Sequence, residues 1–295
     1  MAHVFSIFCK SYAKDVKRVV RLAQSLDQYN KDAIPFYVSC PHGDLGLFKD
    51  QLSPFPVELM ADEKILEISS SHIQSFEKSM EDFPPHLLQQ LIKSEFWRLK
   101  ISENYLIIDS DSYFIKPFYL NDFMADQHIP YTVIHESKDL LCFAARRGEN
   151  KILEDYCEIR RKFQTIFQRK GKLFDFGPTP VIWSSKVWEG LHETYALDKG
   201  TNIVDMLKAF PCELLWYGEY LLHSQALPLV PIEPLFKVYH YREQFEEGQM
   251  LGDNEDVLGN NYFGVVMQSN WNRSLDSRQK VSTGFLNRVK GLIKR

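Results

Sequence analysis

Apolar positions along the first half of the chain follow two spacings, one typical of strands and one typical of helices. Residues such as Val16, Val19 and Leu26 recur at helical spacing and predict a helix over Asp15–Tyr29, and a second helix is predicted over about Pro85–Ile101. Short apolar runs predict buried strands at His3–Cys9, Pro35–Cys40, Val57–Met60 and Tyr105–Ile108. Strands that alternate with helices predict an α/β fold with a mostly parallel sheet covered on both faces.

The second half of the chain has a less regular pattern. Tyr131–Ile134, Leu141–Ala145 and Val181–Trp183 are predicted strands, and Asn150–Gln168 is a predicted charged helix. Further helices are predicted at Ser185–Tyr195, Thr201–Phe210 and Tyr217–Ala226. Since no linker composition interrupts the chain, we expect one domain over residues 1–275, with a nucleotide-binding half (1–120) and an acceptor half (121–275), followed by a tail (276–295).

Composition supports an ordinary globular protein. The chain has 295 residues, of which 44% are hydrophobic and 25% charged. Its five cysteines include no CxxC pair and indicate reduced thiols, not a disulfide framework or a zinc site. The N-terminus has no secretory signal, and no apolar run reaches the roughly 20 residues of a membrane span. We therefore expect a soluble, cytoplasmic protein.

The net charge of −4 is unevenly distributed. Six basic residues and no acidic ones lie in Ser277–Arg295, which leaves 29 basic against 39 acidic residues elsewhere. This excess of acidic residues across the rest of the chain argues against nucleic acid as the main substrate. The tail combines apolar and basic faces and predicts peripheral contact with the inner face of a membrane; a solvated terminus is the alternative.

The apolar run 105–108 leads directly into Asp109-Ser110-Asp111. Ligands of open parallel sheets bind just beyond the carboxyl ends of the strands. Two carboxylates placed there repel each other unless a cation lies between them, and oxygen ligands favour Mg²⁺ or Mn²⁺, ions that also bridge phosphate oxygens. Asp109 and Asp111 are therefore candidate metal ligands, and Asp111 is a candidate catalytic residue, with Ser110 beside the nucleotide. The alternative is a turn whose side chains cap backbone groups.

The segment Tyr-Leu-Ile-Ile-Asp-Ser-Asp-Ser-Tyr-Phe-Ile-Lys-Pro-Phe (105–118), preceded by Glu95-Phe96-Trp97-Arg98-Leu99, resembles the core of GT-A glycosyltransferases. It is most similar to bacterial sugar transferases encoded with surface-polysaccharide genes, of the capsule or O-antigen type. The resemblance implies a GT-A fold, a UDP- or GDP-linked sugar donor and Mn²⁺ or Mg²⁺ held by the DxD motif. It also implies a saccharide or lipid-linked acceptor bound by the C-terminal half.

Further candidates for nucleotide binding lie before the motif. Lys93 is predicted to reach a donor phosphate, and Arg98 to pair with a DxD carboxylate or the diphosphate; a solvated helix face is the alternative. The loop after the first strand contains Tyr12, which can stack on a base, and Lys14 near free helix N–H groups. Asp44 is predicted to bind base or ribose, unless it is a plain loop residue.

Two later residues are candidates for catalytic roles. Glu219 lies among aromatic residues, where burial raises a carboxyl pKa toward that of a general base, as an inverting transferase needs. The family resemblance implies a third metal ligand near the C-terminus, and His240 is the candidate, with His223 as substitute. The alternatives are a helix-surface glutamate and a packed structural histidine. The loop 175–180 could form a sugar platform with Trp183 and Trp188, although core packing explains these tryptophans equally well.

Two other functions compete with sugar transfer. Haloacid-dehalogenase-type phosphatases also use DxD after a strand, and Gly252–Asp256 is similar to their second acidic motif. That family expects Thr or Val where Tyr113 stands, and an apolar strand before the second motif. A non-catalytic sugar-binding protein on a GT-A scaffold is the other alternative. We expect a metal-dependent glycosyltransferase of surface-polysaccharide synthesis.

Overall fold

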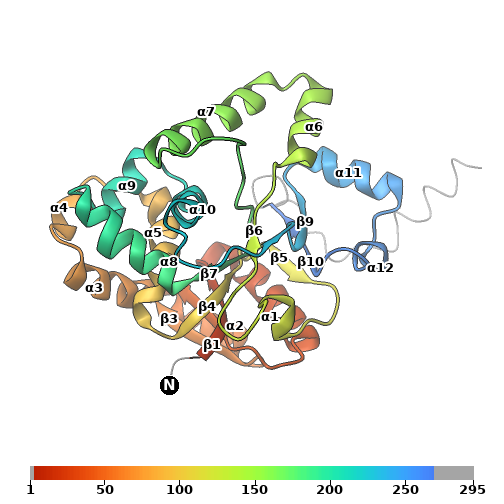
Figure 1. Cartoon of the computed structure of the whole chain (residues 1–295). Helices are drawn as coiled ribbons and strands as arrows, with labels where there is room; N and C mark the ends of the chain where they lie inside the picture. Colours follow the sequence, from red (N-terminus) through yellow and green to blue (C-terminus); the bar gives the residue numbers. More distant parts are fainter. Residues whose placement is uncertain (1–2, 269–295) are drawn as a thin grey trace, which may run out of the picture.

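The computed structural model describes residues 3–268, which fold around a five-stranded sheet of order β3-β2-β1-β4-β7 (Figure 1). β1 to β4 are parallel to one another, and only β7 runs antiparallel to its neighbour. The bounds of these strands are β1 (His3–Lys10), β2 (Phe36–Cys40), β3 (Val57–Ala61), β4 (Ser102–Ile107) and β7 (Val181–Ser184). The predicted α/β fold with a mostly parallel sheet is confirmed.

The central strands are continuous apolar runs because helices cover both of their faces. Ile7 lies opposite Phe36 of β2 on one side and Leu106 of β4 on the other, and it is fully buried. Phe8 stacks on Phe96 with ring centroids 3.9 Å apart. This core fixes the carboxyl ends of β1 and β4 side by side.

Helices lie on both faces of the sheet because right-handed crossovers in opposite directions place them so. α1 and α2 connect β1 to β2 and β2 to β3, whereas the chain from β3 to β4 returns through α3, α4 and α5. The helices of this half are α1 (Val16–Tyr29), α2 (Leu45–Leu52), α3 (Asp62–His72), α4 (Phe76–Met80) and α5 (Leu88–Glu95). The strand order therefore reverses between β1 and β4, which creates a crevice at their carboxyl ends.

The second half adds two small sheets and further helices. One sheet has the order β5-β10-β9, and the other pairs β6 with β8. Their strands are β5 (Ser112–Phe114), β6 (Thr132–Val133), β8 (Pro231–Ile232), β9 (Phe236–Tyr239) and β10 (Gly264–Met267). The helices are α6 (Lys138–Arg147), α7 (Asn150–Ile166), α8 (Ser185–Gly190), α9 (Ile203–Ala209), α10 (Glu213–Ser224), α11 (Arg242–Leu251) and α12 (Glu255–Leu258). Figure 1 shows α6 and α11 away from the central sheet.

One predicted strand is wrong. Leu141–Ala145 lies in α6, which ends at Gly148 with a φ of 69°. A short apolar run does not distinguish strand from helix by periodicity, and Leu, Ala and Arg favour the helix. A left-handed glycine then ends it.

Every other predicted helix or strand that coincides with an observed element is of the predicted type. The predicted helix Pro85–Ile101 is α5 with short 3₁₀ turns at both ends. The sequence pattern missed α2, α3, α4, α11, α12, β5, β8 and β10. The predicted tail, 276–295, lies outside the described residues. Among residues 3–268, no helix is both long and apolar enough to cross a membrane.

Candidate functional site

A small cleft of about 270 Å³ lies at the crevice between β1 and β4. We call it the DxD cleft, because Asp109, Ser110 and Asp111 line one side. The other lining residues come from the end of β1 and the chain after it, from α5 and from the end of β10, and they are Lys10, Ser11, Tyr12, Asp15, Gln89 and Gln268. The motif therefore stands at the topological switch point of the sheet, where α/β folds bind their ligands.

The backbone of the motif is held from three sides. The Ile108 N–H donates to the Phe8 carbonyl at 3.0 Å, which extends the pairing of β4 with β1. The Asp109 carbonyl accepts from the Ser112 N–H at 3.1 Å, and the Asp111 carbonyl accepts from the Met267 N–H at 3.0 Å. The two carboxylates are thus presented from fixed backbone at the edge of two sheets.

Asp109 is held through both of its carboxylate oxygens. Its Oδ1 lies 2.5 Å from Lys93 Nζ, and its Oδ2 accepts a hydrogen bond from the Thr179 hydroxyl. Burial alone would raise the pKa of Asp109, but the Lys93 ammonium and the two hydrogen bonds outweigh burial and lower it. Asp109 is therefore a fixed carboxylate at neutral pH.

Lys93 is a buried cation between two carboxylates. Its side chain is 5% exposed, and Nζ lies 3.8 Å from Glu213 Oε1 at the start of α10. Burial favours the neutral amine, but Asp109 and Glu213 outweigh it and raise the pKa of Lys93. Burial raises the pKa of Glu213, partly offset by Lys93. The helix α5 thus places a positive charge directly behind the motif.

The segment 174–180, which we call the shared loop, links this site to a second cleft. Asp175 anchors it: Oδ2 lies 2.6 Å from both the Ser137 hydroxyl and Arg160 Nη2, and Oδ1 accepts from the Phe176 N–H at 3.0 Å. Thr179 from this loop reaches Asp109, whereas Phe174, Asp175 and Pro178 line the second cleft. One loop therefore borders both spaces.

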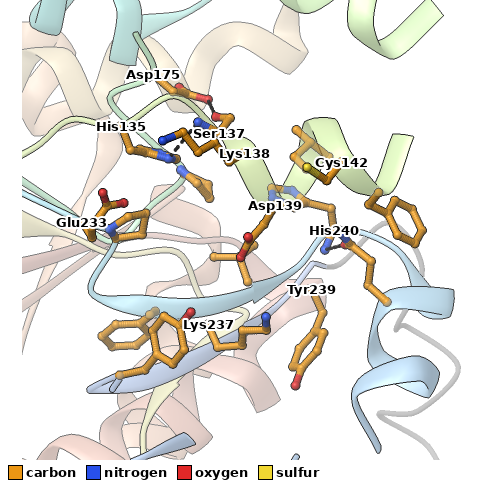
Figure 2. Close-up of a pocket in the computed structure, with 18 of the residues that line it drawn as sticks. His135, Ser137, Lys138, Asp139, Cys142, Asp175, Glu233, Lys237, Tyr239 and His240 are labelled. Carbon is orange, nitrogen blue, oxygen red and sulfur yellow. Dashed lines mark hydrogen bonds between the residues drawn. The ribbon is translucent and has the colours of Figure 1, made fainter. Parts of the chain in front are cut away.

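The second cleft, here the large cleft, has a volume of about 720 Å³. It lies between α6, α11, the end of β9 and the shared loop (Figure 2). His135, Asp139, Glu233, Lys237 and His240 are among its lining residues. Its volume is within the range of small-molecule sites, about 300–1,000 Å³.

Arg98 and Glu219 lie away from both clefts. The Arg98 guanidinium donates to Glu95 and Glu193, each at 2.8 Å, and therefore does not pair with the DxD motif as predicted. Glu219 is fully buried, and both of its oxygens bind Arg169, at 2.5 and 2.7 Å. This environment favours a structural role for Glu219 over that of a general base, since its carboxylate is already paired and faces no cleft. The fully buried Trp183 and Trp188 belong to the core and form no sugar platform.

Only some of the predicted nucleotide-binding residues line the DxD cleft. Tyr12 and Ser110 line the DxD cleft. Lys14 is exposed and lines neither cleft. Asp44 Oδ2 accepts from the Ala13 N–H at 2.7 Å, so it holds the turn after β1. Lys93 contacts the motif itself and leaves its role toward a phosphate a prediction.

His240 follows β9 and lines the large cleft. Burial lowers the pKa of its imidazole, so it is neutral at neutral pH. Within residues 3–268, no three His, Cys, Asp or Glu side chains come together as a metal site. The role of His240 as third metal ligand beside Asp109 and Asp111 stays a prediction. The substitute, His223, lies on α10, where its Nδ1 is 3.2 Å from the Phe167 carbonyl.

Sequence reasoning missed three residues of this site. Thr179 and Glu213 contact Asp109 and Lys93, and Gln268 lines the DxD cleft. They come from segments far from the motif in sequence, and no local pattern singles them out. Asp253, from the acidic motif 252–256 of the phosphatase alternative, lines the large cleft and accepts from the Tyr239 hydroxyl at 2.6 Å. That motif is therefore not part of the DxD cleft.

Comparison with known proteins supports the fold. A family model, described as a family of unknown function (DUF6492), matches residues 2–274. No curated protein sequence matches the chain. Among solved structures, the apo form of mouse xyloside xylosyltransferase 1 is similar over 90% of this chain and 98% of that chain, with a TM-score of 0.50 and 10% identity. The predicted GT-A fold class is thus confirmed. At this identity the likeness concerns the fold alone.

Proposed function

The chain belongs to DUF6492, a family of unknown function, and we propose that it is a glycosyltransferase that moves a sugar from a nucleotide-sugar donor to a saccharide acceptor. The observation that carries the proposal is the position of Asp109 and Asp111. They lie at the switch point of a GT-A-like sheet, beside a small cleft and next to a larger one. The xylosyltransferase with a similar fold supports the same class of reaction.

The residues of the DxD cleft fit a divalent cation bound together with a nucleotide. Two carboxylates and a Ser110 hydroxyl supply the oxygen ligands that Mg²⁺ or Mn²⁺ prefers. Because residues 3–268 contain no three-residue ligand group, phosphate oxygens and water would complete the coordination, as is usual for Mg²⁺. When bound, the metal would stabilise the charge of the departing diphosphate as a Lewis acid.

The protein's own residues prepare this cleft for a diphosphate. Lys93 and Thr179 hold Asp109 in one orientation and keep it ionised, so no reorganisation is needed when charge develops. Tyr12, from the loop after β1, offers an aromatic face for a base. The acceptor would enter from the large cleft across the shared loop. Surface-polysaccharide synthesis and a cytoplasmic place at the inner membrane face stay predictions.

A thermal-shift assay with UDP and GDP, each with and without Mn²⁺, tests this function. We expect a nucleotide diphosphate and Mn²⁺ together to raise the melting temperature of the wild type. At a ligand concentration about 100-fold above Kd, binding adds about 2.7 kcal/mol to the free energy of unfolding. Asp111→Asn should abolish this shift, since the motif loses a ligand charge. Asp198→Asn, at an exposed site outside both clefts, should keep it. The absence of any shift in the wild type would refute the metal–nucleotide proposal.

A further inference from the structure

Negatively charged side chains outnumber positively charged ones in the lining of the large cleft. Six carboxylate side chains line it, against three lysine or arginine side chains. A ligand with a negative group would meet this excess of like charge at short range, where repulsion between carboxylates disfavours binding. Charge therefore divides sugars into two classes, the neutral and the acidic.

Glu136 is paired with Lys172, whereas Asp139, Glu233 and Glu247 have no side-chain partner within residues 3–268. Asp175 is paired with Arg160, and Asp253 accepts from the Tyr239 hydroxyl. Asp139 and Glu233 are both exposed and make no hydrogen bond or ion pair with any side chain within residues 3–268. Figure 2 shows Asp139 on α6 and Glu233 on the chain before β9, at two sides of the cleft. They are available as hydrogen-bond acceptors for a ligand.

The same cleft also contains complementary groups. Lys237 Nζ lies 5.8 Å from the ring centroid of Tyr239 and 6.0 Å from that of Tyr262, and all three residues line the cleft. An ammonium donor beside aromatic rings, in the same cleft as carboxylate acceptors, suits a molecule with many hydroxyl groups and apolar C–H faces. A pyranose ring has both features.

We propose that the large cleft binds an uncharged saccharide, and that Asp139 and Glu233 both accept its hydroxyl groups and exclude acidic sugars. The proposal deepens the function proposed above, on which it depends only in calling this saccharide the acceptor. It assigns the cleft a ligand class and names two residues that set its specificity.

Saturation-transfer difference NMR on the full chain, without nucleotide or metal, tests the proposal. The probes are matched pairs at pH 7: glucose with glucuronate, galactose with galacturonate and mannose with mannuronate. In at least one pair, we expect the neutral sugar to bind and its acid to bind about fivefold more weakly or not at all, as one close like-charge contact predicts. Equal or stronger binding of the acids would overturn the proposal, and so would the absence of binding by every neutral sugar.

The double variant Asp139→Asn, Glu233→Gln then tests the two residues. Removing both charges should raise binding of the acid toward that of its neutral partner, an increase that a damaged fold could not produce. Asp256→Asn, which removes an exposed carboxylate outside the cleft, should leave the discrimination unchanged. If the acids stay excluded in the double variant, these residues do not set specificity. Because the assay contains no nucleotide, its outcome is separate from that of the thermal-shift test.

Discussion

The two clefts are built in different ways. The DxD cleft lies at strand ends of a buried sheet, and the side chain at its base, Asp109, is held by a cation and a hydroxyl. The large cleft lies between helices and loops of the second half, and its acids Asp139 and Glu233 lack such partners within residues 3–268. A paired charge is oriented before a ligand arrives, whereas an unpaired one is free to bind the ligand itself.

This difference suits the proposed division of roles. A leaving diphosphate develops the same charge in every reaction, so a rigid electrostatic site serves it well. An acceptor is recognised by hydroxyl groups whose arrangement differs from sugar to sugar, so exposed acceptors and donors on several elements serve it better. Three substitutions test whether the contrast between the clefts is real.

The largest effect is expected from Lys93→Met. The change removes the cation between Asp109 and Glu213 and leaves two carboxylates without it. We expect a loss of about 3 kcal/mol in the free energy of unfolding at pH 7, at the lower end for a broken buried pair because the Asp109 side chain is 33% exposed. Nucleotide-dependent stabilisation should be lost as well. Urea unfolding of the variant and of the exposed-site control Lys49→Met measures the loss.

The pH dependence of that loss gives a second check. The pKa of Asp109 is lowered in the folded wild type, so its stabilisation is present above the unfolded value of about 3.9 and disappears as the pH falls through the folded value. In the variant, burial without the cation raises the pKa of Asp109 and Glu213, so the free energy of unfolding falls as the pH rises. The difference between the two proteins should therefore shrink from pH 7 toward pH 4. A constant difference would mean that the charges of Asp109 and Glu213 are not what Lys93 stabilises.

A smaller effect is expected from Glu219→Gln, which probes a residue outside both clefts. The amide keeps one of two bonds to Arg169, so we expect a loss of about 2 kcal/mol in unfolding free energy. The shift produced by nucleotide and Mn²⁺ should be unchanged. Glu189→Gln, at an exposed site of α8, is the matched control. A general base would behave in the opposite way, with stability kept and the rate of sugar transfer reduced by about 10² or more.

The smallest effect is expected from Thr179→Val, at the loop that borders both clefts. The valine keeps the shape of the side chain but donates no hydrogen bond to Asp109, which can be solvated instead, so a loss of about 1 kcal/mol is expected. The affinity for nucleotide with Mn²⁺ should fall about fivefold, whereas saccharide binding measured by NMR should stay constant. Isothermal titration supplies the first value, with Thr194→Val as control. An equal fall in both affinities would show that the clefts are not separate sites.

Much of the DxD cleft could be predicted from the sequence because its parts are contiguous. The apolar run of β4 leads directly into the two acids, and the alternation of strands and helices places their ends at one edge of a sheet. Lys93, on the predicted helix before the motif, was expected to reach a donor phosphate. The direct contact between Lys93 and Asp109 was not predicted, because it depends on the packing of α5 against the sheet.

The large cleft could not be predicted because no single segment contains it. Asp139 lies on α6, which the apolar run 141–145 disguised as a strand, and Glu233 and Lys237 come from chain about 100 residues later. Arg98 and Glu219 show the converse error. Both looked like functional charges, yet each is paired within the protein, and a sequence does not reveal where a charged side chain finds its partner.

The shared loop has a consequence for how such proteins diverge. Phe174, Asp175 and Pro178 shape the large cleft, while Thr179 holds the carboxylate of Asp109. Under the proposed function, a substitution in the loop that alters acceptor choice would also displace the hydroxyl that holds Asp109, so selection would act on both properties at once. α6 and α11 contribute no residue to the lining of the DxD cleft, whereas β9 pairs with β10, whose Met267 N–H holds the Asp111 carbonyl. Under the proposed function, new acceptor preferences arise most readily through α6 and α11, with the loop and the donor chemistry inherited intact.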